Sequence, residues 1–372
     1  METPLAIASG QILVYHLFTV ADTVDLDRLG RALGADAVIA RFTPRRPTPE
    51  YLQYRNPPLT FSLGTHTLHP RPEEALPARV SAKIFDFGVL ALRWEVPCPA
   101  TWDGLVQVAG RYIDNPAIEV LSRQILHDLQ PRLAPFLKNP PREALFEDYT
   151  IFYVQGFAET LDAEHLLTTR GPSLAQLMRG EAKALSAAEQ AEVLGKRISY
   201  FADDLAVIDW NTAFIYDPEG ATEHMDALEF ANAELLELRF YDRLLDEQLD
   251  AIYHEIERGQ ALPRWKSWLR NDYQRTQQRL MAVTVDVIEL TEQIENALKF
   301  IGDLYSARIY RAIAERLRLS EWEASIDGKI RTAQEVYQML TDQVNTRRSV
   351  ALELIIILLI AFEVVMALTT RH

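Results

Sequence analysis

The sequence contains a single cysteine, Cys98, among its 372 residues. One thiol cannot close a disulfide within the chain, and it cannot supply the several thiolates of a zinc or iron–sulfur centre. This usage fits a protein of a reducing compartment. Nearly half of the residues are apolar, at 48%. Because the length suffices for about two domains, we expect a sizeable hydrophobic core.

Basic residues are missing from the start of the chain, where the first 27 residues contain no lysine or arginine. A secretory signal peptide needs a basic first segment, and a mitochondrial presequence is rich in arginine and poor in acids. This start is instead acidic, with Asp22, Asp25 and Asp27. We therefore expect a protein that does not enter the secretory or the mitochondrial route, which favours a bacterial chain.

Positive charge is scarce throughout, because 53 acidic residues outnumber 38 basic residues and give a formal net charge of −15. Phosphate backbones and anionic lipid surfaces attract lysine and arginine. We therefore expect no general nucleic-acid binding, and any contact with an anionic partner has to be local.

The short motifs of catalysis are missing as well. The sequence has no glycine-rich dinucleotide loop, no phosphate-binding P-loop and no serine nucleophile elbow. Residues 86–88 spell Asp-Phe-Gly, as in protein kinases, but without a kinase catalytic loop they are better interpreted as a hairpin turn. His66 and His69 lack further ligands at metal-binding spacing, and Asp204 and Asp209 are expected to flank a strand. We predict no catalytic residue, no metal and no cofactor.

Residues 1–220 combine the patterns of strands and helices. Runs of β-branched and aromatic residues predict strands, and 79–97 reads as a hairpin that turns near Asp86 and Gly88. The other predicted strands are 11–20, 37–42 and 147–157, and 203–220 is predicted to hold a last strand and an exit loop. The predicted helices are 22–34, 101–130, 173–178 and 186–194. This mixture predicts a head domain of α+β or α/β class over 1–220.

Residues 221–348 have a different character, since Pro263 is their only proline. Apolar residues recur there with alternating spacings of three and four, which is the stripe of a coiled coil. The stripes comprise Leu228, Ala231, Leu235, Leu238, Asp242, Leu245, Leu249, Ile252 and Ile256, then Val283, Val287, Leu290, Ile294, Ala297, Ile301 and Leu304, and then Ile326, Ile330, Ala333, Tyr337, Leu340 and Val344. We predict an antiparallel coiled-coil stalk that also supports homo-oligomers.

One local group of basic and aromatic residues interrupts the stripes, in the stretch LPRWKSWLR at 262–270. Such residues together can bind nucleic acid or an anionic surface. The alternative is that the tryptophans pack a helical turn and the charges face water, and we prefer it. The candidate surface-binding patch consists of Arg264, Trp265, Lys266, Trp268 and Arg270.

A long apolar run occupies residues 349–370. As a helix, the part from Val350 to Leu368 would span roughly 28 Å, close to the ~30 Å of bilayer hydrocarbon. Arg347 and Arg348 precede it, and a basic pair on that side favours a cytoplasmic head. We predict a transmembrane tail anchor in the inner membrane, with the lipid bilayer as a partner. The alternative is a buried core helix.

Two carboxylates, Glu353 and Glu363, interrupt this run. Each lies about one turn from an end of the predicted span, where a charge costs less than the ~2.5–3.5 kcal/mol expected at mid-bilayer. They are either tolerated, protonated or turned to water, or they hydrogen-bond a neighbouring span and specify assembly. Both interpretations stay open, and we prefer assembly.

The stretch LELIIILLIAFEV at 352–364 resembles the ending of the "required for meiotic nuclear division" family, which includes the bacterial YagE-like proteins. Leu352, Glu353, the isoleucines 355–357 and the pair 363–364 match, whereas the family's tryptophan is Leu354 here. The resemblance implies a mixed N-terminal domain, helices, one terminal span and no known enzymatic activity. Mitochondrial members resemble tethers that support translation at the inner membrane, which implies a protein or ribosome partner.

These patterns together predict a non-catalytic, self-associating scaffold or tether. Its expected parts are a head at 1–220, a helical stalk at 221–348 and a membrane anchor at 349–370. Two alternatives belong to other classes. One is an enzyme with an unrecognised hydrolase or nucleotide site in the head, and perturbed acidic or histidine residues that converge in a cleft would favour it. The other is a protein of membrane remodelling or envelope stress.

Overall fold

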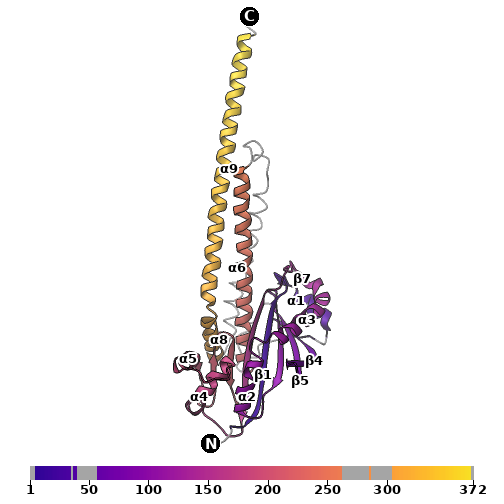
Figure 1. Cartoon of the computed structure of the whole chain (residues 1–372). Helices are drawn as coiled ribbons and strands as arrows, with labels where there is room; N and C mark the ends of the chain where they lie inside the picture. The colour runs from indigo at the N-terminus through magenta and orange to yellow at the C-terminus, as the bar shows by residue number, and fades with distance from the viewer. Residues whose placement is uncertain (1–4, 35–36, 40–56, 262–284, 286–303, 370–372) are drawn as a thin grey trace. The chain divides into compact units, whose positions relative to one another are not determined.

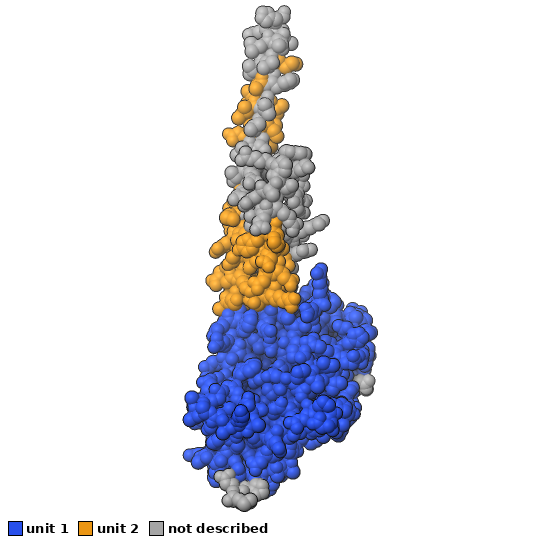
Figure 2. All heavy atoms as spheres, in the orientation of Figure 1, with its two compact units in different colours: residues 1–240, 288–322 blue, residues 241–287, 323–372 orange. Residues whose placement is uncertain are grey.

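A computed structural model describes residues 5–34, 37–39, 57–261, 285 and 304–369 of the chain. The chain divides into two compact units, which Figure 2 colours separately. Unit 1 consists of residues 1–240 and 288–322, and unit 2 consists of residues 241–287 and 323–372.

Unit 1 is built on a sheet of nine strands, visible in Figure 1 with its indigo and magenta strands. Its order is β3-β4-β5-β6-β1-β8-β11-β10-β9. The strands are β1 (Ile7–Thr19), β3 (Ala37–Ile39), β4 (Leu59–Arg71), β5 (Glu74–Ile84), β6 (Val89–Pro97), β8 (Phe146–Phe157), β9 (Arg197–Ile198), β10 (Leu205–Ile208) and β11 (Thr212–Tyr216). Two short strands, β2 (Thr23–Val24) and β7 (Leu137–Lys138), pair separately.

Neighbouring strands in this sheet are antiparallel, except that β8 and β11 are parallel. Strand β1 lies at the centre and pairs with β6 on one side and β8 on the other. The Asp-Phe-Gly triplet lies in the turn between β5 and β6, and its Gly88 has a φ of 85°. A side chain at Gly88 would meet the Ala21 carbonyl oxygen, so only glycine fits this predicted turn.

Helices cover one face of the sheet. They are α1 (Leu26–Leu33), α2 (Trp102–Val108), α3 (Pro116–Leu133), α4 (Ala163–Arg179) and α5 (Ala187–Val193), with 3-10 turns at Ala109–Arg111 and Ala134–Phe136. Trp94 and Trp102 are fully buried in the core that this layer forms with the even-numbered residues of β1. Side-chain caps fix where these helices begin: Asp162, for example, accepts from the backbone N–H of His165.

The first part of α6 (Glu223–Ala261) and helix α8 (Leu304–Arg316) belong to the other face of the sheet. Phe230 of α6 lies 6.3 Å, ring to ring, from both Phe85 and Phe87 of the β5–β6 turn. Tyr310 of α8 donates a hydrogen bond to Glu234 of α6, and both residues are buried. Unit 1 therefore has three layers, and the α+β class that the sequence predicts for the head is confirmed.

Unit 2 contains the second part of α6 and most of α9 (Leu319–Thr369). Lys329 Nζ lies 2.7 Å from Asp242 Oδ1 and 2.6 Å from Asp246 Oδ1, and Ser325 donates to Asp242 at 3.2 Å. The polar stripe position Asp242 is therefore matched by a cation. Ser325 contacts Asp242, and Lys329, one turn further along α9, also reaches Asp246, one turn further along α6. The two helices therefore run parallel here.

In an antiparallel stalk of three successive helices the first and the third run parallel, so the pair α6 and α9 does not decide the predicted arrangement, which depends on the helix between them. Stripe residues Leu245, Ile326, Ile330 and Ala333 are buried as expected. The segment that was predicted to run back between the two helices, 281–303, lies outside the described residues apart from Val285.

The predicted transmembrane tail anchor at 349–370 is also corrected. Within the described part of the chain, none of the helices combines the length and the apolar character that crossing a bilayer requires. The apolar run is the end of one 51-residue helix, α9, whose first half is charged, and Glu353 is exposed on it. The predicted inner-membrane location with a cytoplasmic head is therefore wrong, and the lipid bilayer as a partner stays a prediction.

Candidate functional site

The most unusual polar group of unit 1 lies near the start of β8. Asp148 stands directly across from His16 of β1 in the antiparallel ladder, so both face the helical layer that contains α3. Asp114 precedes α3, and its charge is one cause of the raised pKa of Asp148. Asn211, from the turn between β10 and β11, donates through Nδ2 to Asp114 Oδ2 at 3.2 Å. Three separate segments therefore meet at one carboxyl pair.

The backbone around Asp114 is held in an uncommon conformation. Asp114 has a φ of 48°, in the left-handed region that non-glycine residues rarely adopt. The next residue, Asn115, is the N-cap of α3 and accepts from the N–H groups of Ala117 and Ile118. The Thr150 hydroxyl of β8 donates to the Tyr112 carbonyl oxygen at 3.1 Å and ties this segment to the sheet.

The environment of Asp148 disfavours its charge. Burial, followed by the nearby charge of Asp114 and the hydrogen bond to it, raises the pKa of Asp148 to about 7. A nearby like charge adds to the burial penalty on the ionised form. Asp148 can therefore give or take a proton near neutral pH.

His16, the cross-strand neighbour of Asp148, is uncharged. Its Nδ1 lies 2.7 Å from Ser122 Oγ, and Trp94 Nε1 donates to the same oxygen at 2.8 Å. Burial, helped by the Arg123 guanidinium, lowers the pKa of His16 to about 3. His16 is therefore a neutral core histidine that anchors α3 to the sheet.

The turn that supplies Asn211 is fixed by a buried ion cluster. Asp209 is fully buried and pairs with Arg179 of α4 at 2.5 Å, while Arg316 of α8 lies 4.0 Å away. Asp209 Oδ1 also accepts the N–H of Trp210 at 2.9 Å. Trp210 itself is 55% exposed, so a rigid turn presents a large aromatic side chain to solvent.

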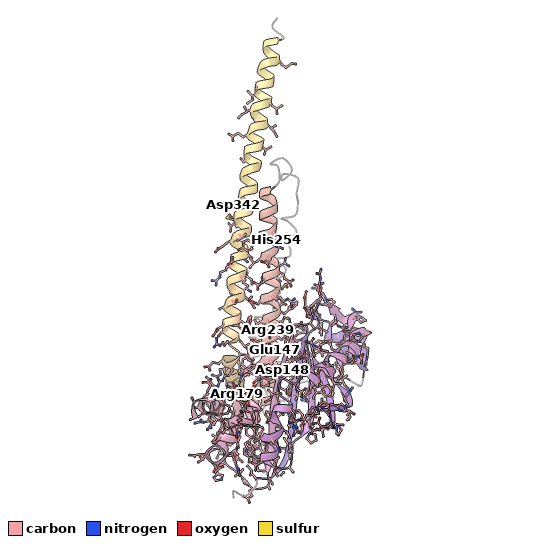
Figure 3. The ribbon with its side chains drawn as sticks, in the orientation of Figure 1. Glu147, Asp148, Arg179, Arg239, His254 and Asp342 are labelled. Atoms are coloured by element: carbon pink, nitrogen blue, oxygen red, sulfur yellow. The ribbon has the colours of Figure 1, made fainter. Side chains whose placement is uncertain are left out.

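The opposite face of β8 carries a separate ion pair. Glu147, adjacent to Asp148, pairs with Arg239 of α6. Figure 3 labels Glu147, Asp148, Arg179 and Arg239 among the side chains of unit 1. Because successive side chains of a strand point to opposite faces of the sheet, Glu147 and Asp148 lie on different faces.

A buried acid on α6 has one carboxylate oxygen without a hydrogen-bond partner among the described residues. Glu237 is 2% exposed, and its Oε2 has no hydrogen-bond partner among the described residues. Burial, followed by the charges of Asp86, Glu234 and Asp22, raises the pKa of Glu237 well above its usual value. The described residues nevertheless contain no group of three or more acids, histidines or cysteines that could hold a metal ion.

Glu237→Gln is expected to stabilise the protein at pH 8 by about 1–3 kcal/mol, the typical cost of an unsatisfied buried polar group. Because the pKa of Glu237 is raised on folding, its stability cost grows as pH rises above the unfolded value of about 4.3. The gain should therefore vanish near pH 4. Urea unfolding at both pH values measures it, with the exposed Glu247→Gln as the matched control. A gain that is equal at both pH values would contradict the assignment.

A family model described as "Uncharacterized protein MJ0711, N-terminal domain" matches residues 9–223, which is more than half of the chain. The chain belongs to this family. The family match extends from β1 to the first residue of α6 and so includes Asp114, Asp148, Asp209 and Asn211.

The relationship extends beyond that domain. "Uncharacterized protein MJ0711" of Methanocaldococcus jannaschii is 24% identical over 265 residues, which cover 71% of this chain and 78% of the relative. No solved structure matches. The resemblance to the "required for meiotic nuclear division" family stays a prediction.

The residues that the sequence singled out are not brought together. Glu353 is exposed on α9, whereas the side chains of Glu363, Arg347 and Arg348 lie outside the described ones, as does the whole patch 264–270. Burial raises the pKa of Cys98 to about 12, so its thiol is not activated. His66 bonds the Leu63 carbonyl oxygen, as an ordinary strand histidine does. Asp204 and Asp209 flank β10, as predicted.

Sequence reasoning missed the carboxyl pair itself. Asp114 and Asp148 are 34 positions apart and carry no shared motif. The available signal was an acid at the start of an otherwise apolar strand, which does not reveal its partner.

Proposed function

We propose that this protein is a non-catalytic scaffold that assembles with further copies of itself through the outer part of α9. The observation that supports this is a set of apolar side chains that unit 2 leaves in water. Leu352 is 60% exposed, Leu359 61% and Ile355 44%. Apolar stripes of this size on a helix are normally covered by another helix.

The spacing of these residues favours a second copy as the cover. Leu352, Ile355, Leu359 and Met366 follow the three-four alternation of coiled-coil core positions. A stripe of that kind is complementary to itself, because each residue can pack into a hole formed by the same stripe of another copy. Ile356 and Ile360 are also exposed and widen the apolar face.

A double variant tests this assembly. Leu352→Lys together with Leu359→Lys puts two charges into the stripe, and burying an unpaired charge costs several kcal/mol. The assembled full-length protein is therefore expected to fall to the monomer mass in light scattering at micromolar concentration. Gln334→Lys with Gln338→Lys adds the same charge to exposed positions of the same helix and should leave the mass unchanged. A wild-type protein that is already monomeric, or a stripe variant of unchanged mass, would contradict the proposal.

The second candidate is a hydrolase, and the Asp114–Asp148 pair is the observation that favours it. A carboxyl group whose pKa lies near neutrality, with a second acid nearby, can exchange a proton with a water molecule or a leaving group. A hydrolase would lose its rate on Asp148→Ala and keep it in the stripe variant, whereas the scaffold has no rate to lose. The resemblance to tethers adds a protein or ribosome as the expected partner of the scaffold.

A further inference from the structure

The outer part of α9, where the exposed apolar residues lie, extends beyond the helix that covers its inner part. Asp246 of α6 and Lys329 of α9 pair where the two helices run parallel. At an equal rise on both helices, Ala261 at the end of α6 lies level with residue 344 of α9. Leu352 lies roughly 12 Å further along α9, which continues past the end of α6 in Figure 1. Helix α6 therefore does not cover the apolar residues from Leu352 onward.

The apolar face that α6 leaves uncovered is wide. Successive residues of a helix are about 100° apart around its axis. The order around the axis is Ile355, Leu359, Leu352, Ile356 and Ile360, over an arc of roughly 140°. Each of these five side chains is at least 44% exposed. The seam of a two-stranded coiled coil is narrower than this arc, so a single neighbouring helix would leave part of the face in water.

The face contains two coiled-coil seams that lie side by side. One runs through Leu352, Ile355 and Leu359, with steps of three and then four. The other runs through Leu352, Ile356 and Leu359, with steps of four and then three. The seams share both leucines, and they differ in the isoleucine on either side. A helix with two adjacent seams fits between two neighbouring helices, as in a closed bundle of three or more.

The residue types in these seams also disfavour a dimer. In the first seam, leucines 352 and 359 occupy the a positions and Ile355 the d position. Leucine at a with isoleucine at d favours three or four parallel strands, whereas a β-branched residue at a with leucine at d favours two. The second seam has the dimer pattern, but the a position after Ile356 is Glu363. A carboxylate is costly in the core of a pair of helices.

We propose that the outer parts of α9 from three or four copies of the chain form a closed parallel bundle, in which each helix contacts two neighbours through its two seams. This inference rests on the self-association proposed above and adds the number and the arrangement of the copies. Copies related by one rotation axis have parallel helices. Glu353 lies about 20° beyond Ile360, at the edge of the apolar face. It is exposed there, so the bundle does not bury its charge.

Sedimentation equilibrium of the full-length protein in detergent-free buffer counts the copies. Three or four chain masses at micromolar concentration are the expected result. Two chain masses would overturn the bundle and leave the proposed self-association in place. One chain mass would overturn both, and a continuous series of larger masses would overturn the closed arrangement.

A swap within the first seam tests the a and d assignment. Leu352→Ile and Leu359→Ile together with Ile355→Leu keep the seam apolar but give it the pattern that favours two parallel strands. The three- or four-chain form is therefore expected to lose population to a two-chain form. A swapped protein with the mass distribution of the wild type would refute the assignment.

A variant of the second seam separates a closed bundle from a pair of helices. Ile356→Gln with Ile360→Gln places amides between neighbours in the bundle, so the mass should fall to two chains or one. In a pair of helices built on the first seam both positions face water, and the mass would not change. Ile357→Gln is the control, because Ile357 lies about 60° beyond Ile360 and outside the face. It is 60% exposed and should keep the wild-type mass after substitution. An unchanged mass in the double variant, or an equal fall in the control, would overturn the bundle.

Discussion

Asp209→Ala is expected to lower the free energy of unfolding by about 3–5 kcal/mol, the usual cost of removing one partner of a buried ion pair. Asp209 is completely buried, and the Arg179 guanidinium that pairs with it is only 21% exposed. Removing the carboxylate leaves the charge of Arg179 largely desolvated and also removes an acid that lies 4.0 Å from Arg316. Urea unfolding followed by circular dichroism measures the loss.

The same variant should also disturb the β10–β11 turn. Asp209 Oδ1 accepts the N–H of Trp210, so its removal frees the turn that carries the exposed indole. Trp210 emission is therefore expected to become less anisotropic in the folded variant.

A matched control uses the other carboxylate that pairs with Arg179. Glu189 lies 2.8 Å from Arg179 Nε but is 42% exposed. Exposed ion pairs contribute about 0–1 kcal/mol, so Glu189→Gln should cost less than ~1 kcal/mol. Equal losses in Asp209→Ala and Glu189→Gln would show that burial does not set the strength of the cluster.

The same turn shows where sequence reasoning was limited. Residues 203–220 were predicted as a last strand and an exit loop, because β-branched, aromatic and apolar residues are frequent in 205–216. The structure instead forms a tight hairpin at Asp209-Trp210-Asn211, which lacks the glycine of common two-residue turns. Long-range ion pairs hold this turn, and their partners lie 30 and 107 positions away from Asp209. Local patterns contain no trace of such contacts.

Elements with strong local signals were predicted well. Gly34 ends α1 at a φ of 60°, Gly88 makes the β5–β6 turn, and the run at 147–157 is β8. Strand β4 was missed, because most of its alternate residues are polar or exposed and a proline-rich stretch precedes it. The apolar tail was wrongly predicted as a transmembrane anchor: it is the end of the 51-residue helix α9, and no described helix is long and apolar enough to cross a bilayer.

The layer between the sheet and α6 gives the other large expected effect. Lys83 of β5 lies 2.7 Å from Asp226 and also pairs with Glu229, which is 2% exposed. Burial opposes the ammonium charge, but the two carboxylates more than offset it and raise the pKa of Lys83. Lys83 is therefore the cation that keeps a buried glutamate ionised under α6.

Lys83→Met is expected to cost about 3–5 kcal/mol, because Glu229 then keeps a buried charge without its closest cation. The exposed Arg79 of the same strand pairs with Glu95 and is 69% exposed, so Arg79→Met should change stability by less than ~1 kcal/mol. Urea unfolding compares the two variants, and equal losses would refute the assigned role of Lys83.

Removing both buried partners distinguishes a lost ion pair from lost packing. The double variant Lys83→Met with Glu229→Leu removes both charges of the buried pair. The second carboxylate that pairs with Lys83, Asp226, is 28% exposed and reaches water. Replacing a buried pair by apolar residues is often neutral, so most of the loss should be recovered. In the single variant Glu229 takes up a proton at low pH, because its folded pKa exceeds the unfolded value of about 4.3. The loss from Lys83→Met should therefore be larger at pH 8 than at pH 5. A double variant that is no more stable than Lys83→Met, with a loss independent of pH, would mean that Lys83 acts through packing alone.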